Sequence, residues 1–400
     1  MPSHPVHPSA LSYARAAVRR ELRPTLRLAL PLVLAEVGWM SMGIIDTLMV
    51  GRLPQSAVAL GAVSLGSALY YLVAIFANGL LLGLDTLVSH AFGRTDLDDA
   101  RQSLATGIVL AIVLSPMVMA IVLLWPPLMR IAGVQSVIVD AMAPFLRALN
   151  WGTLPLLLAF AMRRYLQAVH VVRPVMFAYI TANVANALFN WIFIFGKLHS
   201  PAFGVAGSGW STCVARAYMA AVLAFAVFRF LRRNRSGSRV TLFNVGRARS
   251  VLALGLPAAT QILLEIGVFS VVSAMIGRLG AVPLAGHQIA INCASFTYMV
   301  PLGISSAAAV RVGSALGRGD RAAAREAGWM AITLGAGFMA CAGVVLVAMP
   351  RLIARAFTPD AAVIRAAATL LVIAAAFQLF DGLQTVATGA LRGAGDTRTP

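Results

Sequence analysis

The chain alternates between long apolar runs and short polar breaks. Ten runs contain about 20 or more residues, and each is long enough to cross roughly 30 Å of hydrocarbon as an α-helix. These runs lie near residues 27–51, 57–90, 102–125, 143–166, 174–196, 205–230, 251–277, 284–312, 326–350 and 362–391. The pattern therefore predicts an all-α polytopic membrane protein.

The polar breaks reveal an internal repeat. The stretch SHAFGRTDLDDAR at 89–101 returns as GSALGRGDRAAAR at 313–325, and ALPLVL at 29–34 resembles GLPAAT at 255–260. The shift of about 225 residues passes over six spans, an even number, so both copies have the same membrane orientation. We predict two six-helix bundles, related by an axis along the membrane normal, that form a two-lobed secondary transporter.

The repeat also defines the predicted domains. A polar and basic tail at 1–24 precedes an N-lobe at 25–231, and a C-lobe at 250–400 follows a basic linker at 232–249. The linker contains six arginines and no apolar run. In the first copy two further helices follow the position that matches Pro400, so the second bundle is expected to be truncated after its fourth helix.

The basic residues are distributed unevenly between the two sides of the membrane. The formal net charge is +18, and of the 32 basic residues 23 lie in the segments on the side of the N-terminus, eight lie on the other side, and Arg216 lies inside a span. The positive-inside rule then predicts a cytoplasmic N-terminus and attraction to anionic lipid head groups on that face. Nucleic-acid binding is not needed to explain the charge.

The residue types argue against an enzyme or a resident metal. Hydrophobic residues make up 60% of the chain and charged residues 12%, and no HExxH, GxSxG or cluster of His and Asp is present. Cys213, Cys293 and Cys341 are isolated within apolar spans, so neither a disulfide nor a metal site is predicted. We expect no cofactor.

Five acidic residues lie inside the predicted spans: Glu36, Asp46, Asp85, Glu265 and Asp381. An unpaired acid near the bilayer centre costs about 2.5–3.5 kcal/mol on insertion scales, so each needs a function or a partner. Glu265 and Asp381 lie at comparable depths and are expected to share one cation, because two neighbouring carboxylates do not both ionise cheaply.

The remaining intramembrane polar residues allow more than one interpretation. Asp46 is either a cation or proton site of the N-lobe or a helix-end acid that pairs with Arg52. Glu36 is a candidate substrate or proton contact, Asp85 is expected to pair with a loop arginine, and Arg216 is a candidate partner for an N-lobe acid. Interhelical hydrogen bonding and cavity lining are both open for four amides, namely Asn183, Asn186, Asn190 and Gln288.

Long stretches of the chain resemble the multidrug and toxic compound extrusion (MATE) transporters, especially their NorM-like bacterial branch. They are MGIIDTLMVGRL at 42–53, GVAGSGWST at 204–212, LGLPAATQILLEIGVFS at 254–270, AGHQIAINCASFTYMVPLGISSAAAVRVGSALGRGD at 285–320 and FDGLQTVATGALRGAGDTRTP at 380–400. The likeness covers all ten spans. It implies the fold of the wider MOP superfamily.

The resemblance also implies a function. It implies a monomeric multi-pass antiporter of the bacterial inner membrane, in which sodium ions or protons run inward while small organic, often cationic, compounds are exported by alternating access. Asp46, Glu265 and Asp381 match the acidic positions of the family's first, seventh and tenth helices, so we predict them to couple transport to the cation, with sodium, if used, at Glu265 and Asp381. Phe377, a candidate cavity contact, stands where a tyrosine is common.

Two other functions remain open from the sequence. A flippase for a lipid-linked or polysaccharide precursor would share the two lobes. It would require a large basic cavity, however, and the sequence has only one arginine in a span interior. A membrane-embedded enzyme is the more distant alternative.

Overall fold

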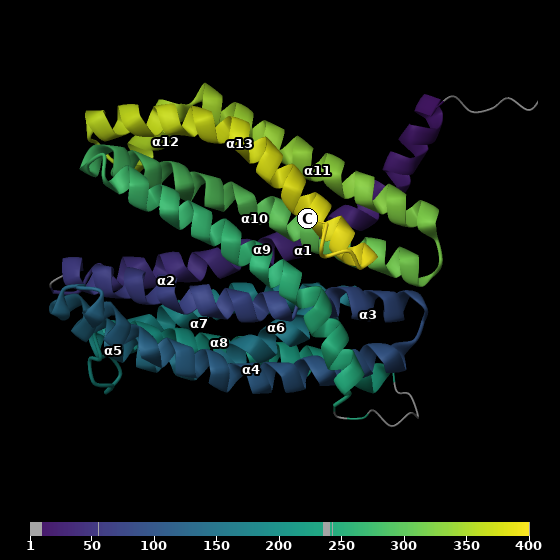
Figure 1. The fold of residues 1–400 in the computed structure, drawn as a ribbon, viewed down its shortest axis with the longest axis horizontal. Coiled ribbons are helices and arrows are strands. Elements are labelled where there is room, and N and C mark those ends of the chain that lie inside the picture. Colours follow the sequence, from purple (N-terminus) through teal and green to yellow (C-terminus); the bar gives the residue numbers. More distant parts are fainter. Residues whose placement is uncertain (1–9, 55, 235–240, 242, 400) are drawn as a thin grey trace, which may run out of the picture.

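The structure is a computed structural model that describes residues 10–54, 56–234, 241 and 243–399. In this part of the chain, thirteen helices form two lobes that lie side by side (Figure 1). The N-lobe comprises α1 (Ala10–Val50), α2 (Ser56–Leu80), α3 (Gly83–Gly93), α4 (Leu97–Ile131), α5 (Ser136–Trp151), α6 (Thr153–Ala168), α7 (Arg173–Phe195) and α8 (Val205–Arg233). The C-lobe comprises α9 (Val245–Gly277), α10 (Ala281–Gly317), α11 (Arg321–Ala348), α12 (Pro350–Phe357) and α13 (Ala361–Ala394).

The ten predicted membrane spans are confirmed. Nine helical segments of the described residues are long and apolar enough to cross a membrane, and α2 and α3 together form one of them. The tenth span is the pair α5 and α6, which is bent by 46° at Gly152. Pro155 lies three residues after this break; it cannot donate a backbone hydrogen bond, and its ring conflicts with the carbonyl four residues earlier, so a bend at this place is expected.

Helix boundaries differ from the sequence prediction in three places. Helix α1 begins at Ala10, so residues 10–24 of the predicted tail are helical. The ends of the predicted linker at 232–249 are also helical, because α8 continues to Arg233 and α9 starts at Val245; its residues 235–240 and 242 lie outside the described residues. The short α12 was not predicted, since eight residues are too few to produce a span signal.

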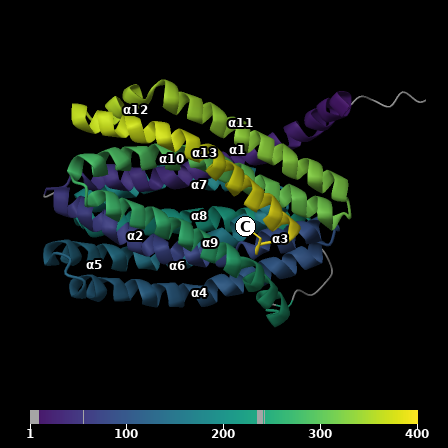
Figure 2. The ribbon, with the colours of Figure 1, turned by 45° about the horizontal axis from the view of Figure 1, so that its top comes forward.

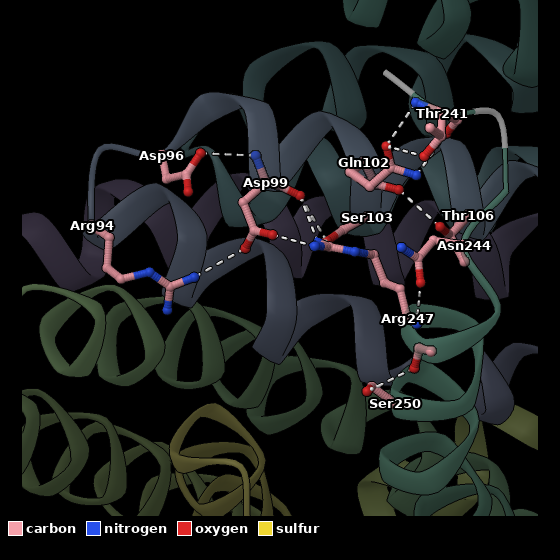
Figure 3. A network of polar contacts seen from close by, with 11 residues as sticks. Arg94, Asp96, Asp99, Gln102, Ser103, Thr106, Thr241, Asn244, Arg247 and Ser250 are labelled. Atoms are coloured by element: carbon pink, nitrogen blue, oxygen red, sulfur yellow. Dashed lines mark hydrogen bonds and ion pairs between the residues drawn. The ribbon is translucent and has the colours of Figure 1, made fainter. Parts of the chain in front are cut away.

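We call the end of the bundle that carries the segment between α8 and α9 the linker face. Figure 3 shows how this segment is anchored to the start of α4. Arg247 donates to the backbone oxygen of Asp99 at 2.8 Å and to Ser103 Oγ at 2.7 Å, and it forms an ion pair with the Asp99 carboxylate. Gln102 Nε2 donates to the Thr241 carbonyl at 2.6 Å. These contacts attach the start of the C-lobe to the N-lobe.

The repeated Gly-Arg and Asp positions mark equivalent helix boundaries in the two copies. Arg94 caps the C-terminus of α3 and Arg318 that of α10. Asp96 then accepts a hydrogen bond from Asp99 N at the start of α4, and Asp320 accepts one from Ala323 N at the start of α11, each at 2.9 Å. The repeated motif is therefore a turn with helix caps.

The lobes approach most closely near the linker face. A Cβ atom added to Gly93 would lie 2.2 Å from the Ser314 carbonyl oxygen and 3.0 Å from the Cα of Gly317, its own repeat mate. Gly79 packs closely against Ala259 of the other lobe, and Gly303, the equivalent position in the second copy, packs closely against Val33. Figure 2 shows α9 lying against α2 at this boundary. Small residues thus let the two backbones meet around the repeat axis.

Candidate functional site

The five acids inside the spans fall into two groups. Glu36 and Asp85 form buried ion pairs with arginines. Within the described residues, the other three have no ion-pair partner, although the chain carries 32 basic residues; these three are Asp46, Glu265 and Asp381. Neutral side chains donate hydrogen bonds to Asp46 and Glu265. The absence of a fixed counter-charge leaves all three carboxylates available for a proton or a cation.

Asp46 lies at the centre of a polar cluster between α1, α7 and α8. Its Oδ1 accepts hydrogen bonds from Asn190 Nδ2 at 2.7 Å and Asn186 Nδ2 at 3.1 Å. Its Oδ2 accepts from Thr212 Oγ1 at 2.8 Å. We call these four residues the N-lobe cluster. The structure does not pair Asp46 with Arg52, so the helix-end interpretation is wrong.

The asparagine spacing explains how α7 supplies two of these donors. Asn186 and Asn190 are four residues apart, so their side chains leave the same face of the helix. Asn190 Nδ2 also donates to Asn186 Oδ1 at 3.1 Å, which orients both amides. Asn183 behaves differently, because it donates to the Gly38 backbone oxygen at 2.7 Å and so joins α7 to α1. The two interpretations of the asparagines therefore apply to different members of the set.

Arg216 is fully buried beside the N-lobe cluster. Its guanidinium donates to the Tyr70 hydroxyl at 2.8 Å and lies over the Tyr70 ring, 4.7 Å from the centroid. Its charge acts on Asp46 from a distance, without forming an ion pair with it. The Tyr70 hydroxyl in turn lies 3.0 Å from Thr153 Oγ1. The predicted neutralising arginine is thus held by aromatic hydroxyls, which the sequence spacing did not indicate.

The C-lobe acids lie on α9 and α13, which a hydrogen bond to Glu265 joins. Glu265 Oε1 accepts from Gln384 Nε2 of α13 at 3.0 Å and from Gln261 Nε2 at 3.1 Å. Asp381 is three residues before Gln384 on α13, and the Glu265 and Asp381 charges interact. The Tyr298 hydroxyl of α10 also lies within electrostatic range of both acids and accepts from Thr385 Oγ1 at 3.2 Å. We call the acids, the two glutamines and Tyr298 the C-lobe cluster.

Two other candidate contacts have no polar bond to the acids of this cluster among the described residues. The Phe377 ring packs edge-on against Phe269, with the centroids 5.9 Å apart. Gln288 is exposed and has no hydrogen bond among the residues that the structure describes. Tyr298, Gln261 and Gln384 were missed by the sequence analysis, because an apolar helix with a single polar position does not reveal which helix it will face.

Buried ion pairs hold the remaining acids. Glu36 pairs with Arg163, which is also bonded to Gln167 Oε1 at 2.7 Å. Asp85 lies 3.2 Å from Arg164 Nη1 and 3.6 Å from Arg392 Nε. The arginine partners of Asp85 are helical and buried, so the expected loop partner was wrong. Because Arg392 belongs to α13, this contact crosses between the lobes.

A cavity of about 1490 Å³ opens between the lobes at the linker face. Its walls are the Glu21–Leu28 part of α1 and the ends of α7 and α8 from the N-lobe, together with the ends of α10 and α11 from the C-lobe. We call it the basic cavity, because it is lined by seven arginines, namely Arg23, Arg27, Arg173, Arg229, Arg233, Arg311 and Arg318. The sequence count of a single arginine inside a span did not anticipate this cavity, since its arginines come from four helices, α1, α7, α8 and α10.

A family model described as MatE matches residues 31–192 and 257–400, in both lobes. The chain belongs to the MatE family, the MATE transporters. The family resemblance inferred from the sequence motifs is thereby confirmed. The two matched segments each include one cluster of unpaired acids: Asp46 in the first, and Glu265 with Asp381 in the second.

Relatives and solved structures agree with this membership. A probable multidrug resistance protein NorM of Mesorhizobium japonicum is 37% identical over 96% of this chain and 83% of its own, and a namesake from Bradyrhizobium diazoefficiens is 34% identical over 94% and 82%. The eukaryotic MATE transporter AtDTX14 superposes with a TM-score of 0.85 at 19% identity, covering 95% of this chain and 84% of its own. A MOP superfamily transporter from Pyrococcus furiosus gives 0.83 at 18% identity, covering 94% and 83%. The predicted MATE and MOP-superfamily fold is confirmed.

Proposed function

We propose that this protein is a cation-coupled antiporter that exports organic, often cationic, compounds across the bacterial inner membrane. The observation that carries the proposal is the contrast among the intramembrane acids. Two are neutralised by arginine, whereas Asp46, Glu265 and Asp381 have no ion-pair partner among the described residues, and neutral donors bond to the first two of these. A carboxylate without a fixed counter-charge gains most from a mobile one. The names of the NorM relatives support multidrug export as the transport activity.

The positive-inside rule supports placing the linker face in the cytoplasm. With this placement, the close contacts between α3 and α10 hold the two lobes together on the cytoplasmic side. Rocking of the two lobes about these contacts would expose the clusters to each side in turn. The inward movement of a cation would then be exchanged for the outward movement of a drug.

The chemistry of coupling rests on competition for the same negative charge. When a proton or sodium ion neutralises Asp381 or Asp46, an organic cation loses its electrostatic attraction to that lobe. When the small cation leaves, the attraction returns. Asn186, Asn190 and Thr212 hold the ionised form of Asp46 through hydrogen bonds, and Gln261 and Gln384 do so for Glu265.

Ethidium efflux from proteoliposomes tests the proposal. The chain is reconstituted, and a sodium gradient and a pH gradient are imposed separately. We expect one gradient to drive efflux and Asp381→Asn to abolish it, while Asp140→Asn retains it, because Asp140 is exposed and pairs with Arg130 away from both clusters. Equal efflux by the Asp381→Asn protein would remove Asp381 from the mechanism, and no efflux under either gradient would contradict antiport.

A lipid-linked precursor flippase is the second candidate, and the basic cavity favours it because phosphate groups bind guanidinium groups well. The cavity lies at the helix ends, whereas the unpaired acids lie within the spans. Translocation of a fluorescent lipid-linked precursor in the same proteoliposomes, without ethidium efflux, would support the flippase over the antiporter.

A further inference from the structure

The basic cavity concentrates uncompensated positive charge. Its lining contains seven arginines and one carboxylate, Glu21, which forms an ion pair with Arg311. Within the described residues, none of the other six arginines has an ion-pair partner. Like charges gathered in one cavity repel each other, so an anion that enters it is strongly favoured.

The protonation of a neighbouring histidine is consistent with the positive charge of the cavity. The loop residue His170 lies in the cavity wall, and its ring nitrogen is 3.3 Å from Ser314 Oγ of the other lobe. Loss of hydration and, to a smaller extent, the charges of Arg311 and Arg318 together lower the pKa of His170 to about 4. The cavity therefore does not need a charged histidine to be positive at neutral pH.

The charge of the cavity changes with depth along α8. Val222, Phe225, Arg229 and Arg233 recur at intervals of three or four residues, so they share one face of the helix. The arginines are at the linker face and the apolar side chains lie one to two turns deeper. From Val222 to Arg233 the helix rises about 16 Å.

Two neighbouring helices repeat this order. On α7, Arg173 stands at the helix start, and Phe177, one turn deeper, is 55% exposed. On α1, Arg23 and Arg27 line the cavity at the level where Leu28 begins the apolar part of the wall. The cavity is thus cationic at its mouth and apolar toward the membrane interior.

We propose that the basic cavity binds an anionic phospholipid of the leaflet that adjoins the linker face. The phosphate lies among the arginines, and an acyl chain lies along Phe177 and Phe225. A soluble phosphate would satisfy only the cationic half of this site, whereas a phospholipid matches both halves. The volume of about 1490 Å³ also exceeds the roughly 300–1,000 Å³ of typical small-molecule pockets.

Binding has a consequence for the lobes, because both contribute to the site. Arg173 and Arg229 come from the N-lobe, and Arg311 and Arg318 from the C-lobe. One phosphate between them would offset the repulsion across the lobe boundary and stabilise the conformation in which α3 and α10 are in contact. The proposal rests on the proposed cytoplasmic placement of this face, but it does not require drug export.

Equilibrium binding of fluorescent phosphatidylglycerol to the purified full chain in neutral detergent micelles tests the proposal. Phosphatidylcholine with the same label measures binding without the anionic charge. We expect the double variant Arg173→Gln/Arg229→Gln to bind phosphatidylglycerol at least tenfold more weakly and phosphatidylcholine unchanged. Both arginines are exposed, so their replacement should not disturb the fold, and a thermal unfolding midpoint equal to that of the wild type checks this.

The matched control is Arg351→Gln/Arg355→Gln in α12, which removes the same charge from exposed positions at the opposite end of the bundle. It should bind phosphatidylglycerol like the wild type. Equal losses in the two double variants, or no preference for phosphatidylglycerol over phosphatidylcholine, would overturn the proposal.

Two further outcomes separate the proposals from one another. Displacement of the lipid by millimolar inorganic phosphate would overturn the lipid site in favour of a soluble-anion site. Selective lipid binding in a protein that shows no gradient-driven efflux would leave the lipid site intact and contradict the antiporter.

Discussion

The partner of each intramembrane acid decides what that acid can do. Glu36 and Asp46 are ten residues apart on α1, or about 15 Å along the helix. Glu36 meets Arg163 and is neutralised, while Asp46 meets two amides and a hydroxyl. Residues of the same charge on the same helix therefore serve a structural ion pair and a candidate coupling site.

Removing one donor to Asp46 should weaken its ionised form. Asn190→Leu deletes a charge-assisted hydrogen bond to Asp46 that is worth about 1.5–3 kcal/mol, so Asp46 should release its proton less readily. Proton-driven efflux should then slow by about tenfold or more near neutral pH, and its pH optimum should move to higher pH. Efflux measured against pH checks this. Asn183→Leu is the control on the same helix, because Asn183 bonds to the Gly38 backbone rather than to Asp46. An identical profile in both variants would count against the cluster.

Replacing Glu36 should affect stability. Glu36→Gln leaves Arg163 buried without its counter-charge, which costs about 3–5 kcal/mol for a typical buried pair. We expect a lower thermal unfolding midpoint in detergent and partial recovery in Glu36→Gln/Arg163→Gln. An unchanged midpoint together with lost efflux would instead make Glu36 a transport residue.

At the scale of elements, short polar bridges tie the helices of the two lobes together. Asp85 of α3 contacts Arg164 of α6 and Arg392 of α13. Thr86 Oγ1 donates to the Arg392 backbone oxygen at 2.6 Å, and His90 Nε2 lies 2.8 Å from the Gly393 backbone oxygen. These bonds fasten the end of α13 to α3 at the linker face.

Breaking this bridge should loosen the contact between the lobes at the linker face. Asp85→Asn removes the charge that holds two buried guanidinium groups, one from each lobe. A Ser314→Cys reporter, at a side chain that is 1% exposed, should then react faster with a hydrophilic maleimide in a background without the native cysteines. Asp140→Asn should leave the reaction rate unchanged, and equal rates in all three proteins would mean that the bridge does not hold the lobes.

At the scale of the whole molecule, equivalent residues of the two repeat copies contact each other. Gly93 faces Gly317, and Ser89 faces Gly313, in each case across a sequence shift of 224. Contact between equivalent residues requires them to lie beside the axis that relates the copies. The predicted parallel repeat therefore appears as a physical boundary at which the lobes touch.

A methyl group at this boundary should separate the lobes. Gly93→Ala places a Cβ atom 2.2 Å from the Ser314 carbonyl oxygen, which a side-chain movement does not relieve. We expect faster maleimide labelling at the Ser314→Cys reporter and slower efflux. Gly337→Ala in α11 is the matched control, since no atom lies within 4 Å of its added Cβ. Normal labelling in Gly93→Ala would indicate that the backbones shift to accommodate the methyl group.

The sequence by itself determined the spans, their order, the two copies and which acids lie inside the membrane. Apolar run length sets whether a helix can cross a membrane, and that property is local to each run. The repeat likewise follows from residues compared along one chain. Even the caps at Asp96 and Asp320 are local, since each bonds to the residue three positions later.

Only the tertiary structure decided which acids are neutralised and where the arginines gather. Asp46 and Thr212 are 166 residues apart, and Glu265 and Gln384 are 119 apart. Their meeting depends on how each helix is rotated and tilted against its neighbours, which is set by packing over the whole bundle. The basic cavity is likewise assembled from five helices, so no single stretch of sequence contains it.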